Sequence, residues 1–85
     1  MDGYKRYDVT VDYVTTATLT VSAPDEERAE ELVQAYIESE RGQDDLLRRM
    51  AVTRNVPDGF EIAMVEEAGP RVPDLYWADH ARGDY

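Results

Sequence analysis

The stretch YDVTVDYVTTATLTVSAPDEERAEELVQAYI, residues 7–37, decides the fold because its hydrophobic period changes part of the way along. Apolar and polar side chains alternate over residues 7–13 and again over residues 16–21. A period of two, with many β-branched and aromatic residues, is typical of half-buried strands. We therefore expect two neighbouring strands that pair as a hairpin, although the connection VTT contains no Gly, Asn or Pro to define the turn.

After Pro24 the period becomes that of a helix. The apolar side chains recur at i, i+3, i+4, i+7 and i+8, which places them in one stripe. They are Ala29, Leu32, Val33, Tyr36 and Ile37. Asp25 is well suited to cap the start of this helix, and Gly42 is well suited to end it. The sequence therefore predicts one main amphipathic helix between these two residues.

The second half of the chain carries weaker signals. Residues 45–50 favour a short second helix, which Asp44 would cap. The segment VPDGF, residues 56–60, is typical of a turn. The residues that follow alternate again, which predicts a third strand. Its inward face would hold Phe60, Ile62 and Met64.

Together these elements predict an α+β domain over residues 1–69, with a small antiparallel three-stranded sheet and one main helix packed on one face. The third strand would pair with either the first or the second. Residues 70–85 contain two prolines and no clear period, so we expect a C-terminal tail that is either mobile or covers a sheet edge. The other sheet face would be polar and solvated. It would show Asp8, Thr10, Asp12, Thr16, Thr18, Thr20 and Glu61.

The composition excludes several classes of protein. The 85 residues contain no cysteine, which rules out disulfides, thiol nucleophiles and thiolate metal sites. The single histidine, His80, lies in the tail, and no glycine-rich phosphate loop occurs. We therefore expect no enzyme, no catalytic residue, no metal and no cofactor. No apolar run reaches the roughly 20 residues of a membrane span and the N-terminus is unlike a signal peptide, so a soluble, cytoplasmic protein without membrane contact is expected.

The net charge of −10 is concentrated in residues 24–40, where seven acids and one base give −6. A chain with this charge repels nucleic acid and anionic lipid and is drawn towards basic surfaces. Direct binding of DNA or RNA is therefore not expected, whereas a basic protein partner is.

Helix formation explains only part of this acidity. Acids in the first turn complement the helix dipole, but Glu38 and Glu40 lie at the opposite end, where negative charge is slightly unfavourable. No Lys or Arg at i+4 relieves the repulsion between Glu27 and Glu31. Three interpretations stay open: an ordinary solvated face, acidity that serves solubility or salt adaptation, and a surface shaped for a basic partner. For the last, the candidate protein-binding residues are Glu27, Glu30, Glu31, Glu38, Asp8 and Asp12.

Two further features are compatible with binding. A basic patch flanks Leu46, Leu47 and Met50, and it either neutralises the acidic helix within the fold or contacts a partner. It consists of Arg41, Arg48, Arg49 and Arg54. The aromatic pair Tyr76 and Trp77 either anchors an interface or covers the edge of the core.

The layout of the chain resembles the DpnD/PcfM-like small proteins of phages and plasmids. In these a strand pair precedes the pattern A-x-(D/S)-E-E-x-A-x-x-x-V, and a final strand ends in acids. The match covers residues 4–67 and leaves the tail outside. The matching residues are Ala23, Asp25, Glu26, Glu27, Ala29, Val33, Phe60, Ile62 and Val65. The resemblance implies a mobile-element setting and supplies no activity or catalytic residue.

Small acidic phage proteins without catalytic motifs look like inhibitors of host defence, anti-CRISPR proteins above all. By this analogy we expect an anti-CRISPR inhibitor in the cytoplasm of the infected host cell. It would act as a DNA mimic on the basic, nucleic-acid-binding surface of a Cas effector complex. The alternative is a non-catalytic accessory or structural domain of a mobile element, acidic only for solubility. Both a monomer and a homodimer are compatible with the sequence.

Overall fold

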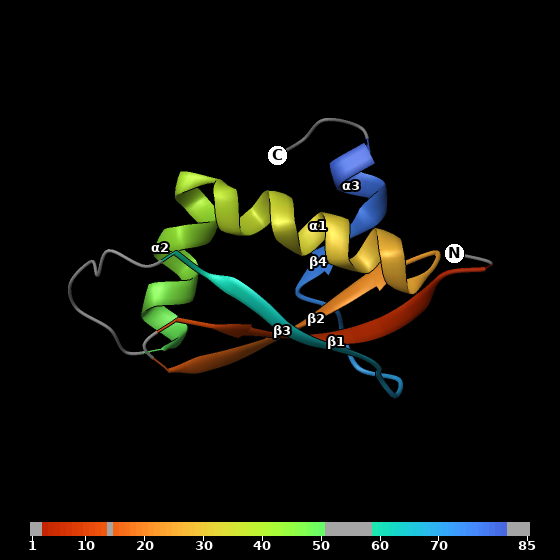
Figure 1. Cartoon of the computed structure of the whole chain (residues 1–85). Helices are drawn as coiled ribbons and strands as arrows, with labels where there is room; N and C mark the ends of the chain where they lie inside the picture. Colours follow the sequence, from red (N-terminus) through yellow and green to blue (C-terminus); the bar gives the residue numbers. More distant parts are fainter. Residues whose placement is uncertain (1–2, 14, 51–58, 82–85) are drawn as a thin grey trace.

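The computed structural model describes residues 3–13, 15–50 and 59–81 (Figure 1). In Figure 1, α1 lies across one face of the sheet, and α2 turns downward at its far end. In chain order the elements are β1 (Lys5–Asp12), β2 (Thr16–Ala23), α1 (Glu26–Glu38), α2 (Glu40–Arg49), β3 (Glu61–Glu67), β4 (Leu75–Tyr76) and α3 (Trp77–Ala81). The α+β character and the helix on one sheet face agree with the sequence.

The sheet has four strands in the order β3-β1-β2-β4. β1 pairs antiparallel with β2, as expected, with Val9 opposite Leu19. β3 pairs antiparallel with β1 on its other side, so the third strand lies next to the first. β4 pairs parallel with β2. The three predicted strands are antiparallel as expected. The prediction missed the fourth strand, β4, because a two-residue strand is too short to produce a hydrophobic period.

The core lies between the sheet and α1. Alternation turns the odd-numbered residues of β1 and β2 inward, and Val9, Val11 and Leu19 are fully buried. The predicted helix stripe is confirmed at four positions, Ala29, Leu32, Val33 and Ile37, which are all buried. The fifth, Tyr36, is half-buried and packs against the same core.

β3 contains a β-bulge that its sequence pattern did not reveal. Met64 and Ile62 face consecutive residues of β1, so Ala63 between them has no partner. The extra residue reverses the alternation. Ile62 and Val65 pack against the core, whereas Met64 is 48% exposed. The prediction that Met64 shares the inward face was therefore wrong, while Phe60 does pack against the core.

A single serine joins the two long helices. Ser39 is the C-cap of α1 and the N-cap of α2. Its Oγ donates to the carbonyl oxygen of Tyr36 at 2.7 Å and accepts from the backbone N–H of Gly42 at 3.0 Å. Gly42 therefore lies inside α2 and does not end α1, and α2 begins well before residue 45 without Asp44 as its cap. Both predictions were wrong because the serine satisfies backbone groups of both helices.

The chain reaches β4 by crossing the face of the sheet opposite α1, as Figure 1 shows beneath the strands. Asp74 fastens this connection to β2. Its N–H donates to the Thr20 carbonyl oxygen at 2.6 Å, and its Oδ2 accepts from the Thr20 N–H at 3.0 Å. Thr20 was expected on a solvated face, but it is only 7% exposed because of this cover.

Candidate protein-interaction surfaces

The first candidate is the acidic helix surface, which we define as Glu27, Glu30, Glu31 and Glu38. Asp25 caps the start of α1: its Oδ1 accepts from the Arg28 N–H at 2.8 Å, so the predicted N-cap is confirmed. The buried stripe fixes the rotation of α1 and leaves all four glutamates exposed to solvent. At 1.5 Å per residue, the first and last of them lie about 16 Å apart along the helix axis.

Arg28 forms ion pairs with one part of this surface and not with the other. Its guanidinium lies 2.9 Å from Glu31 and 3.8 Å from Glu27, and it also sits 5.8 Å from the ring centroid of Trp77. The expectation that no base relieves the repulsion between Glu27 and Glu31 was therefore wrong. It considered only i+4 spacing, whereas Arg28 pairs at i+3. Glu30 and Glu38 make no ion pair with any residue that the structure describes.

The two predicted aspartates lie on the opposite face of the sheet and do not join this surface. Asp8 accepts from the Thr20 hydroxyl at 2.8 Å and pairs with Arg71 at 3.0 Å. Its side chain is only 17% exposed, so it is committed to contacts within the fold. Asp12 lies at the end of β1, opposite Glu61 of β3. The sheet therefore separates the six predicted site residues into a group of four and a group of two.

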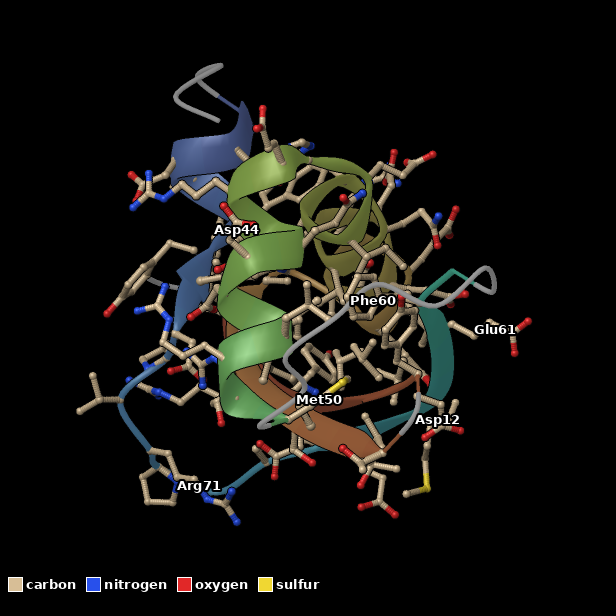
Figure 2. The ribbon with its side chains drawn as sticks, turned by 90° about the vertical axis from the view of Figure 1, so that its left-hand side faces the viewer. Asp12, Asp44, Met50, Phe60, Glu61 and Arg71 are labelled. Carbon is tan, nitrogen blue, oxygen red and sulfur yellow. The ribbon has the colours of Figure 1, made fainter. Side chains whose placement is uncertain are left out.

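The second candidate is the acidic sheet surface, which we define as Asp12, Glu61 and Glu66. Like charges face each other twice across the β1–β3 pair, Asp12 opposite Glu61 and Asp8 opposite Glu66. Such pairs are unfavourable to the sheet. Figure 2 shows Asp12 and Glu61 on the same side of the molecule, away from Asp44 on α2. Glu66 was missed because the bulge hid which residues of β3 face outward.

Within the described part of the basic patch, none of Arg41, Arg48 and Arg49 forms an ion pair with a residue of α1. Arg49 instead pairs with Asp45 at 2.9 Å and with Asp74 at 3.4 Å. Arg41 and Arg48 are exposed, and Arg54 lies outside the described residues. Arg49 thus links α2 to the segment that precedes β4, which is a structural role.

Asp45 also accepts a hydrogen bond from the Tyr36 hydroxyl at 2.6 Å. Burial, reinforced by this bond to a carboxylate, raises the pKa of Tyr36. Burial alone would raise the pKa of Asp45, but the hydrogen bonds from Tyr36 and Arg49 outweigh it and hold that pKa below its usual range. At neutral pH Tyr36 is therefore protonated and Asp45 is ionised, and their hydrogen bond stabilises both of these states. The geometry is that of a closed structural network without a free acid or base.

The tail aromatics have different environments. Trp77 packs against the core, whereas Tyr76 is 42% exposed. His80 lies with its ring centroid 5.2 Å from that of Trp77. A hollow on α1 is lined by Glu27, Glu30, Glu31 and Gln34, which all belong to one helix, so it is an open gap between solvated side chains.

Within residues 3–13, 15–50 and 59–81, no group of three or more His, Cys, Asp or Glu side chains is arranged to hold a metal ion. In the same part of the chain no helix has the length and apolar character needed to cross a membrane.

Comparison with known proteins gives no relative: no protein family, curated protein or solved structure matches this chain. The resemblance to DpnD/PcfM-like proteins therefore stays a prediction.

Proposed function

We propose that this protein is a non-catalytic inhibitor that covers the basic, nucleic-acid-binding surface of a partner with the acidic helix surface. The single observation that carries the proposal is the row of exposed glutamates on α1, a helix held by four buried side chains. A helix fixed in this way presents its carboxylates without the entropy cost of ordering a loop.

The length of the row is compatible with a surface that binds phosphates. Its length of about 16 Å matches about five base-pair steps of 3.4 Å. Lysine and arginine side chains that contact phosphates along this length would meet three carboxylates near one end of the row and one at the other. Such an interface gains association rate and specificity from charge complementarity, and it weakens as salt is added.

The partner that we propose is a CRISPR effector complex, which holds nucleic acid in a basic channel. This part of the proposal rests on the analogy with small acidic phage inhibitors and on the resemblance to mobile-element proteins. The second candidate is an accessory domain that is acidic for solubility. The ion pairs of Arg28 with Glu27 and Glu31 favour it, because they engage two of the four glutamates within the fold and offset one of the four negative charges.

Neutralising the two unpaired glutamates separates these candidates. The double variant Glu30→Gln/Glu38→Gln is expected to weaken binding to a purified effector complex by about tenfold or more, because two charge contacts are lost. Both side chains are exposed, so stability should change by less than about 0.5 kcal/mol. Titration calorimetry at low and moderate salt measures the affinity, and thermal unfolding measures the stability.

The matched control is Glu40→Gln/Asp44→Asn on α2. It also removes two negative charges, but from exposed positions outside the acidic helix surface. If the control weakens binding as much as the α1 variant, net charge and not the surface determines binding. An α1 variant that keeps full affinity for a partner that binds the wild-type chain would contradict the proposal.

A further inference from the structure

The fold treats the two edges of its sheet differently. The edge of β2 is covered at residues 20–22 by β4 and by the two hydrogen bonds between Asp74 and Thr20. At the other edge stands β3, and no strand lies beyond it among the described residues. An uncovered edge strand offers a row of backbone N–H and C=O groups to another chain.

The direction of these groups follows from one hydrogen bond. The N–H of Ala68 donates to the carbonyl oxygen of Arg6 in the neighbouring strand at 2.8 Å, so residue 68 turns its N–H towards β1. Backbone groups of successive strand residues point to opposite sides. Those of Glu66 therefore also face β1, while those of Val65 and Glu67 face outward. The bulge lies at Ala63, so this outward-facing end of β3 is regular.

The charges along β3 determine which kind of chain could pair with this edge of the sheet. Glu61, Glu66 and Glu67 are exposed, and the ion pair that they make among the described residues is that of Glu67 with Lys5, at 3.9 Å. Two copies of β3 paired antiparallel about Met64 would place Glu61 opposite Glu67, which is unfavourable. A strand that carries Lys or Arg meets the same acids favourably, and the exposed Met64 offers it an apolar contact.

From this juxtaposition we propose that the free edge of β3 binds an extended, lysine- or arginine-bearing segment of a partner protein as an added strand. Main-chain hydrogen bonds to Val65 and Glu67 supply the register, and the flanking carboxylates supply the preference for basic side chains. The inference deepens the proposed function, since it shares the basic partner, but it uses residues on the sheet and not on α1.

The competing explanation is edge protection. Acids and bulges on an edge strand also prevent aggregation. Edge protection alone predicts that no strand binds here, whether basic or not. The two explanations therefore differ in one observable, which is the protection of the outward amides when a basic strand is present.

Hydrogen exchange measured by NMR on the full chain tests the proposal. The probe is a synthetic peptide of about ten residues in which Lys and Val alternate, and the control peptide has proline at every third position. The first peptide is expected to slow exchange at the Val65 and Glu67 amides by about tenfold, while the Met64 and Glu66 amides, which already face β1, change little. Unchanged exchange at Val65 and Glu67 would overturn the proposal, as would equal effects of both peptides.

Two variants at one position distinguish the backbone from the charge. Glu67→Pro removes an outward N–H, whereas Glu67→Gln removes the charge and keeps the N–H. We expect the proline variant to weaken peptide binding about tenfold and the glutamine variant about threefold at most, with unchanged melting temperatures. Equal losses in both would overturn the added-strand geometry.

The remaining outcomes are also decisive. Protection of the same amides that rises with protein concentration without peptide would assign the edge to a second copy of this chain and overturn the proposal. Peptide-induced shifts confined to α1 would overturn it too, while leaving the acidic helix surface as a binding site. The variant Glu30→Gln/Glu38→Gln is expected to keep the edge protection, so failure of the proposed function and failure of this inference are distinguishable.

Discussion

Replacing Gly42 with alanine is expected to destabilise the protein by about 3 kcal/mol and to lower its melting temperature by roughly 10–25 °C. A Cβ at this position would overlap the carbonyl oxygen of Tyr36 and lie 2.8 Å from the Ser39 Oγ. That carbonyl already accepts from both the N–H and the Oγ of Ser39, so it cannot move without opening the corner between α1 and α2. A domain of this size has a total stability of roughly 4–13 kcal/mol, so the loss is a large fraction of it.

Thermal and urea unfolding followed by circular dichroism measure this effect. Gly69→Ala is the matched control, because a Cβ at Gly69 meets no atom within 4 Å. It should change stability by less than about 0.5 kcal/mol. If Gly42→Ala unfolds like the wild type, Gly42 does not pack closely against Tyr36 and Ser39 at the junction of α1 and α2.

Replacing Asp74 with alanine has the second largest expected effect, a loss of about 2 kcal/mol. The substitution leaves the Thr20 N–H without its acceptor and breaks the ion pair with Arg49. Both contacts hold the C-terminal segment against the sheet, so β4 and α3 are expected to loosen. Trp77 is the only tryptophan and packs against the core, so its fluorescence should shift to the red as it meets water.

Asp74→Asn separates the two contacts. The amide oxygen still accepts from Thr20, but the charge that pairs with Arg49 is gone, so about half of the loss is expected. Unchanged melting and unchanged Trp77 emission in the alanine variant would show that the segment is held by packing alone.

The hairpin and α1 were predictable because their signals are local. Alternation over residues 7–13 and 16–21 defines which side of each strand is apolar. Asp25 caps the helix by accepting a hydrogen bond from the N–H of Arg28, three residues further along the chain. These features depend on residues a few positions apart. They therefore do not depend on how distant segments of the chain pack.

The features that could not be predicted depend on contacts between distant segments. β4 exists because Asp74 reaches Thr20, 54 residues earlier in the chain. The bulge at Ala63 appears only when β3 is aligned against β1. The double use of Ser39 as a cap was not recognised, because Gly42 is the stronger local stop signal.

The candidate site was predictable in part. The exposure of the four glutamates follows from the helix period and is confirmed. Their grouping with Asp8 and Asp12 was inconsistent with the predicted fold itself, since even-numbered residues of the first strand face away from the helix. The pairing of Asp8 with Arg71 had no signal in the sequence, because it depends on the path of the connection to β4.

Competition with nucleic acid tests the proposed function most directly. A panel of purified CRISPR effector complexes, each carrying fluorescent target DNA, is titrated with the protein at low and moderate salt. We predict that at least one complex releases its DNA as one protein binds per complex, and that added salt weakens this binding. Binding that leaves the DNA in place, or no binding to any complex of the panel at either salt, would contradict the proposal.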